Sequence, residues 1–128
     1  MSPKRISERV IGCAMTVSNT LGTGFLESVY EKALYVELTE QGICFKSQVP
    51  YDVEYKDNRV GLYFADLVIE EVLLLELKAT AKLNSQHDAQ VMNYLKVSGL
   101  SVGILLNFGT PRLQLKRIVW NYDAELVI

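Results

Sequence analysis

The sequence predicts a single α+β domain over residues 1–128, with helices packed on a mixed β-sheet. Its length is typical of one domain. Apolar residues recur at helical spacing in the first 40 positions and again after residue 85, whereas other stretches alternate or run continuously apolar, as strands do. Apolar residues make up 49% of the chain and charged residues 22%, which indicates a packed core rather than disorder.

The first two predicted elements are helices. Ser2 and Pro3 are typical of a helix start, and the amphipathic pattern that follows them ends near Gly22. A second helix is expected over residues 26–41, and Gly42 ends it as a left-handed cap residue.

Two strands and a hairpin turn are expected next. From residue 48 the apolar pattern changes to a period of two, and Pro50 places this strand toward a sheet edge. Residues 56–59 have the composition of a tight turn, which leads into a second strand over residues 60–69.

The rest of the chain completes the sheet. Residues 72–79 are apolar on both faces, which is typical of a central strand. A third helix opens at Ser85, which resembles a capping box with Asp88. Strands over residues 102–108 and 113–120 follow. The predicted order of elements is ααβββαββ.

Composition excludes several classes of protein. The sequence contains no apolar run long enough to span a membrane and no signal-peptide pattern after its first residues, so we expect a cytoplasmic protein. Cys13 and Cys44 are flanked by apolar residues and are expected to be buried free thiols. With one His and no paired cysteines, a structural zinc site is excluded.

Charge is distributed unevenly along the chain. Residues 1–76 contain seven Lys and Arg against twelve Asp and Glu, whereas residues 77–122 contain six against one. Asp123 and Glu125 bring the net charge to −2. This balance argues against a simple electrostatic binder of nucleic acid, but the division suits a protein that holds a metal cation beside a polyanion. A chance segregation on a solvated surface gives the same pattern.

Three charged residues lie on strands that are otherwise apolar. Alternation places Glu76 and Lys78 on one face of the run 72–79. If the strands pair through the turn at 70–71, Asp66 lies near Glu76, because each residue is four or five positions from that turn. Asp66 is expected to share its own strand face with Leu62, Phe64 and Val68.

Adjacent carboxylates on an apolar face favour a metal site. Burial of an unpaired carboxylate costs several kcal/mol, and two neighbouring carboxylates raise each other's pKa. A divalent cation offsets both penalties, and oxygen ligands suit Mg²⁺ or Mn²⁺. The alternative is a structural salt bridge of Lys78 with Glu76 or Asp66.

The helices carry further candidates. Glu27 borders the apolar stripe of its helix and supplies a third carboxylate, unless it is merely solvated. Gln90 and Tyr94 share one face of the third helix, where Gln90 can bind a phosphate or a water and Tyr94 can hold Gln90 or a carboxylate. The alternative for Tyr94 is packing in the core. His87 is expected to lie at the surface, with an accessory role at most.

These residues carry a resemblance to a known family. The stretch Gly24-Phe-Leu-Glu27-Ser-Val-Tyr30 resembles the signature of the GxxExxY family, a small group in the PD-(D/E)XK nuclease superfamily. The resemblance continues through Asp66, the triplet Glu76-Leu77-Lys78 and the motif that joins Gln90 to Tyr94, and it covers nearly the whole chain. The triplet alone is a weak signal, but the complete set is specific. The Q-x-x-x-Y motif is shared with RecB-like exonuclease domains.

The resemblance implies a restriction-endonuclease-like core with the order αβββαβ. It implies a divalent metal held by Glu27, Asp66 and Glu76, with Lys78 orienting or activating the attacking water. Gln90 and Tyr94 complete the implied catalytic set. The family's PD position reads Ala-Asp in this sequence, which is a common relaxation.

We therefore expect Mg²⁺- or Mn²⁺-dependent hydrolysis of phosphodiester bonds in nucleic acid, with DNA as the favoured substrate. A nuclease this small needs a homodimer to cut both strands. The alternative is a non-catalytic nucleic-acid-binding or protein-interaction module on a nuclease scaffold, because fold does not fix function. The residues expected to grip flanking phosphates are Lys82, Lys96, Arg112, Lys116 and Arg117.

Overall fold

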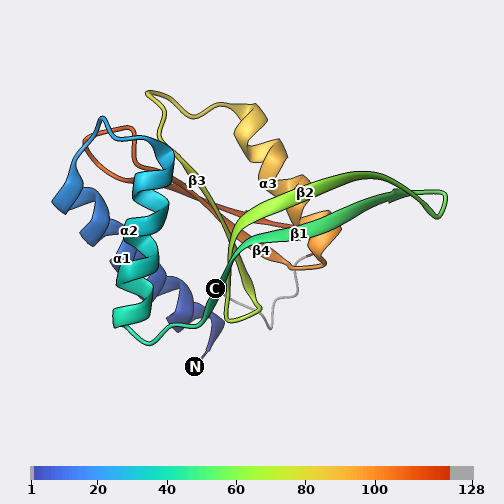
Figure 1. Ribbon diagram of the computed structural model, residues 1–128, viewed down its shortest axis with the longest axis horizontal. Coiled ribbons are helices and arrows are strands. Elements are labelled where there is room, and N and C mark those ends of the chain that lie inside the picture. The colour runs from blue at the N-terminus through green and yellow to red at the C-terminus, as the bar shows by residue number, and fades with distance from the viewer. Residues whose placement is uncertain (1, 122–128) are drawn as a thin grey trace.

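The computed structural model describes residues 2–121, and its elements follow the predicted order ααβββαββ. Two helices cover one face of a five-stranded sheet and one helix covers the other, which gives three layers (Figure 1). The helices are α1 (Pro3–Leu21), α2 (Glu27–Glu40) and α3 (Ser85–Ser98). The strands are β1 (Phe45–Tyr55), β2 (Asn58–Ile69), β3 (Leu73–Lys78), β4 (Val102–Asn107) and β5 (Gln114–Val119).

The sheet is mixed and has the order β1-β2-β3-β4-β5. Strands β3 and β4 are parallel and are joined through α3, whereas the other neighbouring pairs are antiparallel. The central position of β3 explains why its sequence is apolar on both faces. Strand β1 lies at an edge of the sheet and pairs with a neighbouring strand on one side only. Pro50, which has no backbone N–H to donate, is tolerated in such a strand. The predicted α+β class is confirmed.

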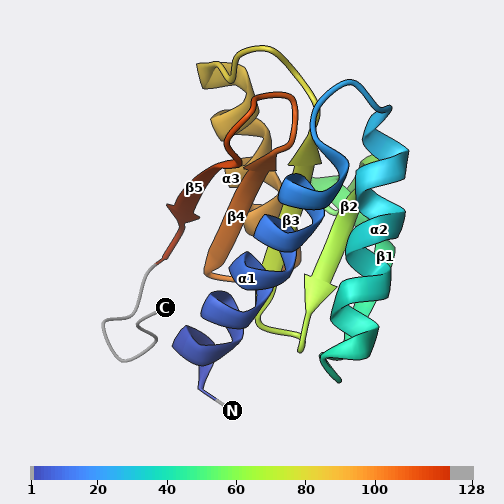
Figure 2. The same cartoon turned by 90° about the vertical axis from the view of Figure 1, so that its left-hand side faces the viewer.

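Side chains of β3 alternate between two separate cores. Leu73, Leu75 and Leu77 are fully buried against α1 and α2, in a cluster that also contains Tyr30. Leu74 is fully buried in a smaller cluster beneath α3. Figure 2 shows α1 and α2 lying side by side over their face of the sheet, with α3 on the far side. A single strand therefore joins both cores.

Two tight turns set the register around β2. Lys56 and Asp57 have φ angles of 49° and 62°, and Glu70 and Glu71 have φ angles of 51° and 60°. Positive φ at both central residues is typical of two-residue hairpin turns that match the twist of the strands. The first turn closes a β1–β2 hairpin that extends beyond the rest of the sheet (Figure 1). The second pairs β2 with β3.

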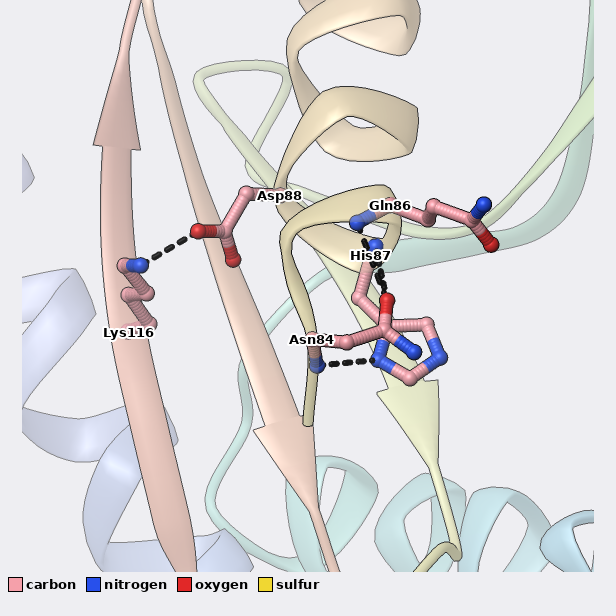
Figure 3. Close-up of polar contacts among 5 residues, drawn as sticks. All are labelled: Asn84, Gln86, His87, Asp88 and Lys116. Carbon is pink, nitrogen blue, oxygen red and sulfur yellow. Dashed lines mark hydrogen bonds and ion pairs between the residues drawn. The ribbon is translucent and has the colours of Figure 1, made fainter. Parts of the chain in front are cut away.

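The N-terminus of α3 differs from the sequence prediction. Asn84 is the cap, and its side-chain oxygen accepts hydrogen bonds from the backbone N–H groups of Gln86 (2.9 Å) and His87 (3.3 Å). In return, Nδ1 of His87 accepts the backbone N–H of Asn84 at 3.1 Å (Figure 3). The predicted capping box of Ser85 and Asp88 is therefore wrong. The true box begins one residue earlier and is closed by an imidazole instead of a carboxylate.

The structure also tests several expectations about single positions, and some of them are wrong. Cys13 is buried as expected, but Cys44 is exposed because it directly precedes the edge strand. That strand begins at Phe45, three residues before the predicted start. Asp123 and Glu125 lie outside the described residues. No helix within residues 2–121 has the length and apolar character needed to cross a membrane.

Candidate active site

Strands β2 and β3 separate at Asp66 and Glu76, and we call this point the fork. The ladder of the two strands ends at the pair Leu67 and Leu75, so Asp66 and Glu76 are the next residues in register. Oε1 of Glu76 accepts the backbone N–H of Asp66 at 3.0 Å, and Oδ2 of Asp66 accepts the backbone N–H of Leu77 at 2.9 Å. Side chains thus replace the ladder bonds. The predicted adjacency of the two carboxyl groups on antiparallel strands is confirmed.

The surroundings of the fork disfavour the ionised form of Glu76. Glu76 is only 3% exposed, and its burial raises its pKa to about 9. The neighbouring Asp66 carboxylate adds to this rise, whereas the Asp66 backbone N–H and the Lys78 ammonium oppose it. Glu76 therefore keeps its proton at neutral pH unless a positive charge approaches the fork.

The regular alternation of β2 breaks at the fork. Ala65 and Val68 both pack in the core beneath α3, although strict alternation would place them on opposite faces. Gln48 lies opposite Asp66 in the β1–β2 register and has a φ of 48°, in the left-handed region that residues other than glycine rarely adopt. The predicted strand face shared by Leu62, Phe64, Asp66 and Val68 is wrong, because the hairpin is distorted there.

Gln48 connects the fork to helix α2. Its amide nitrogen donates to Oδ1 of Asp66 at 3.3 Å and to the two Glu31 carboxylate oxygens at 3.3 and 3.1 Å. The Tyr35 hydroxyl also donates to Glu31. Burial of Tyr35 raises its pKa to about 12, and the bond to Glu31 adds to the rise. The sequence analysis missed Gln48 and Glu31, because contacts between residues so far apart leave no spacing pattern.

The segment Gly24-x-x-Glu27-x-x-Tyr30 places Glu27 at the first position of α2. Gly24 has a φ of 106°, which favours glycine strongly. Tyr30 is fully buried, stacks on Phe108 at a centroid distance of 5.0 Å, and donates its hydroxyl to the Gly22 carbonyl at 2.6 Å. The tyrosine therefore anchors the loop that precedes Glu27, and the glycine allows that loop to turn.

Glu27 belongs to the same electrostatic cluster as the fork. Partial burial of its carboxyl group raises its pKa, and the carboxylates of Asp66 and Glu31 also act in that direction. Lys78 opposes the rise, as it does for Glu76. The structure thus brings Glu27 of α2 into one electrostatic cluster with Asp66, Glu76 and Lys78 of the consecutive strands β2 and β3.

Asn107 fastens the segment that follows β3. Its side chain is fully buried and accepts the backbone N–H groups of Thr80 and Gly109, both at 3.0 Å. It also donates to the Thr80 carbonyl and to the Gln114 side chain, both at 2.9 Å. A Cβ atom at Gly109 would lie 2.2 Å from the Thr80 carbonyl oxygen, so only glycine fits there. Lys78 precedes Thr80 by two residues, and these contacts fix the end of β3 that carries it.

Helix α3 brings Gln90 and Tyr94 to the other side of the fork. Burial of Tyr94 raises its pKa to about 12, with further rises from the charges of Glu76 and Asp66, while a hydrogen bond with Gln90 opposes them. Tyr94 is 8% exposed, and its ring lies edge-on to that of Tyr63 at 5.5 Å. Tyr94 packs in the core, as the alternative interpretation expected, and it also forms a hydrogen bond with Gln90.

The five expected phosphate-gripping residues are not gathered on one face. Lys116 forms an ion pair with Asp88 on the α3 side of β5, whereas Arg117 points to the opposite side and donates to Ser7 of α1 at 3.4 Å. Figure 3 shows Asp88 directed toward Lys116, away from Gln86. The other three lie apart from this strand. Lys96 is in the last turn of α3, Lys82 is in the loop after β3, and Arg112 is in the loop between β4 and β5.

The carboxylates fit a hard divalent cation by chemistry and charge. Glu27, Asp66 and Glu76 supply only oxygen donors, and a cation would offset the burial and repulsion that raise the Glu76 pKa. Across residues 2–121, no three acidic, His or Cys side chains converge closely enough to hold an ion as they stand. At the fork, Asp66 and Glu76 each direct one oxygen to a backbone N–H.

Comparison with known proteins places this chain in a family. The model of the PD-(D/E)XK nuclease superfamily matches residues 4–118. Among solved structures, that of SSO0001 is similar, with 18% identity and a TM-score of 0.56 over 77% of this chain and 52% of that chain. The likeness shows the fold alone, and the present chain spans about half the length of that protein. A search of curated proteins finds no match.

The family match extends over every helix and nearly all of the sheet. A mixed five-stranded sheet with helices on both faces agrees with a restriction-endonuclease-like fold. The chain belongs to the PD-(D/E)XK nuclease superfamily.

Proposed function

We propose that this chain is a Mg²⁺- or Mn²⁺-dependent nuclease that hydrolyses phosphodiester bonds in DNA. The observation that carries the proposal is the fork, where a buried Glu76 with a raised pKa adjoins Asp66, and the charge of Lys78 opposes that rise. A cation bound between the two carboxyl groups would offset the cost of keeping them together in an apolar sheet. On the motif around Glu27 we further assign the chain to the GxxExxY group.

Each residue has a task in this proposal. Glu27, Asp66 and Glu76 would hold the cation, which supplies Lewis-acid polarisation of the scissile phosphate when bound. Lys78 would direct its ammonium group to the phosphate or the attacking water, where negative charge develops in the transition state. Gln90 would orient the water or phosphate, held in place by Tyr94. Lys82 and Arg112 would contact phosphates on either side of the cleavage point.

Three broader features belong to the same proposal. The protein would act in the cytoplasm. Two copies would be needed to cut both strands of a duplex at one place, because the chain provides one fork. The remaining basic residues, Lys96, Lys116 and Arg117, would contribute to nucleic-acid binding only outside the immediate site, since they lie on separate surfaces.

One observation favours a second candidate, a nucleic-acid-binding module without catalysis. The oxygens of Asp66 and Glu76 already accept backbone hydrogen bonds, so the fork is satisfied as a structural element. In that case Lys78 would serve only to balance the charge of Glu76. The two candidates predict different behaviour when Lys78 is removed.

The deciding experiment is Lys78→Ala, with Lys56→Ala at the exposed hairpin tip as a matched control. Under the nuclease proposal, Lys78→Ala lowers Mg²⁺- or Mn²⁺-dependent cleavage by about 10²–10³-fold and leaves the melting temperature nearly unchanged. Cleavage of single- and double-stranded DNA and thermal unfolding are measured for both variants. A wild type that cleaves neither substrate, together with a Lys78→Ala variant destabilised by about 3–5 kcal/mol, would establish the binding module instead.

A further inference from the structure

A groove between β2 and α3 lies beside the fork, and the proposed hydrolysis leaves most of it without a role. Its volume is about 510 Å³, which is within the range of sites for small organic ligands. It shares Gln90 and Tyr94 with the candidate active site, so the two sites are continuous. The other lining residues that matter are Tyr63, Gln86, His87 and Asn93.

The lining of this groove is polar but carries no Lys, Arg, Asp or Glu. Gln86, Gln90 and Asn93 follow the spacing i, i+4, i+7 and so project from one face of α3. Figure 3 shows the Gln86 side chain directed away from the ion pair of Asp88 and Lys116, so these two charges lie on another side of the helix. A phosphate would find no counter-charge here, whereas side-chain amides can pair with the donors and acceptors of a heterocycle edge.

Tyr63 adds an aromatic surface to the groove. It is 42% exposed, yet its ring is braced edge-on by Tyr94 at 5.5 Å with an interplanar angle of 66°. A partly exposed ring that is already held in position is suited to stacking, because little side-chain freedom is lost on binding. Gln86 and Asn93 are exposed as well, so the polar groups are accessible from solvent.

We infer that this groove receives an unpaired nucleobase of the substrate strand, which stacks on Tyr63 while the amides of Gln86 and Asn93 bond to its edge. The inference rests on the proposed nuclease function and refines its substrate. Bases in a duplex are stacked and paired and do not present a free face, so the groove selects single-stranded or frayed DNA. A base bound there places its neighbouring phosphate toward Gln90 and the fork.

Binding of a fluorescein-labelled single-stranded DNA of about 12 nucleotides, in EDTA to prevent cleavage, tests the inference. Tyr63→Leu should weaken binding roughly five- to 100-fold, because base stacking on an aromatic ring is lost. Tyr63→Phe should bind as the wild type does. Tyr55→Leu, at another exposed tyrosine on the same hairpin, is the matched control and should have no effect.

The same oligonucleotide with abasic positions separates base stacking from other contacts. The wild type should bind this probe more weakly, and Tyr63→Leu should cause no further loss. Asn93→Ala should weaken binding to one homopolymer more than to the others. An equal effect of Tyr63→Leu on normal and abasic strands, or no effect on either, would overturn the inference.

The outcome is distinguishable from that of the proposed nuclease function. A wild type that binds single strands through Tyr63 but cleaves no DNA with Mg²⁺ or Mn²⁺ would retain the base groove and exclude catalysis. A wild type that cleaves DNA while Tyr63→Leu binds and cleaves normally would exclude the base groove and retain the nuclease. Melting temperatures of all variants show whether the fold is intact.

Discussion

The face of the sheet beneath α1 and α2 is packed with aliphatic and aromatic side chains, whereas the face beneath α3 gives way to polar groups as it approaches the fork. The first face contains Leu73, Leu75 and Leu77, which are all fully buried. The second contains Leu74 and then Glu76, followed by the half-buried Lys78. Both faces are formed by β3, but one is an apolar core and the other contains charged groups of the candidate site.

This contrast explains how a chain of this size carries a polar site in the middle of its sheet. The aliphatic face supplies most of the buried apolar area, so it stabilises the position of β3 from one side. The face beneath α3 can then hold groups that are unfavourable for folding, such as a buried carboxyl group. Adjacent residues of one strand should therefore respond differently to substitution.

The largest effect on stability is expected at Leu75. Leu75→Ala removes a fully buried side chain from the centre of the aliphatic face and should lower the free energy of unfolding by about 2–5 kcal/mol. Urea denaturation measures this loss. At temperatures where the variant remains folded, cleavage should be close to that of the wild type. A loss of cleavage without a loss of stability would contradict the division between the two faces.

Substitution of Glu76, unlike that of Leu75, should abolish cleavage and change how stability depends on pH. Its folded pKa of about 9 exceeds the ordinary value of 4.5, so between these pH values the folded protein holds a proton that the unfolded chain has released. The free energy of unfolding should therefore fall as pH rises through this window, by up to about 1.4 kcal/mol per pH unit. Glu76→Gln should flatten this dependence and abolish cleavage.

The control for this prediction is addition of Mg²⁺. Because a cation displaces the proton from Glu76, binding should strengthen as pH rises, and it should stabilise the wild type more than Glu76→Gln. Denaturation at several pH values, with and without Mg²⁺, measures both effects. Equal slopes for the wild type and the variant would show that Glu76 is ionised in the folded protein.

Gln48, which joins the fork to α2, offers a way to separate strain from function. Gln48→Gly removes both the strained side chain at φ 48° and the amide that joins Asp66 to Glu31. Stability should be unchanged or rise by up to about 1 kcal/mol, whereas metal affinity measured through cleavage should fall about 10–100-fold. Gln48→Ala keeps the strain and loses the amide. Its activity should match that of the glycine variant, with lower stability.

How much of this site could be predicted from the sequence depends on how far apart in the sequence the contacting residues lie. Asp66 and Glu76 could be paired from the sequence because a short turn dictates the register of the strands beside it. Gln48 could not be found, because it reaches Asp66 through a distorted β1–β2 pairing that no local pattern records. No role could be assigned to Asn107 from the sequence, since its bonds to Thr80 and Gln114 join the loop after β3 to the start of β5.

The cap of α3 shows the same limit at short range. Ser85 and Asp88 matched the usual residue types of a capping box, but Asn84 precedes them and is as good a cap residue as Ser. His87 was not considered as its partner, because the imidazole is an unusual acceptor in that position. Local propensity identified the helix correctly and misplaced its cap residue by one.

The smallest predicted effect concerns this cap. Asn84→Ala removes the acceptor for two backbone N–H groups and should cost about 0.5–2 kcal/mol. Because α3 is the helix that covers its face, the loss should appear as faster amide hydrogen exchange in residues 85–98, with little change in α1. Asn84→Asp keeps the acceptor and is the control. Equal acceleration in α1 and α3 would show that the two faces unfold together.

His87 then tests whether the cap has any part in the chemistry. His87→Ala removes only the bond from its ring to the Asn84 backbone, so a purely structural His87 should produce a smaller change in α3 exchange than Asn84→Ala does. Its cleavage rate should likewise fall no further than that of Asn84→Ala, because both variants loosen the same turn. The contrary result would be a much lower cleavage rate in His87→Ala than in Asn84→Ala, together with slower amide exchange in α3. It would show that the imidazole acts on the substrate through the groove it lines.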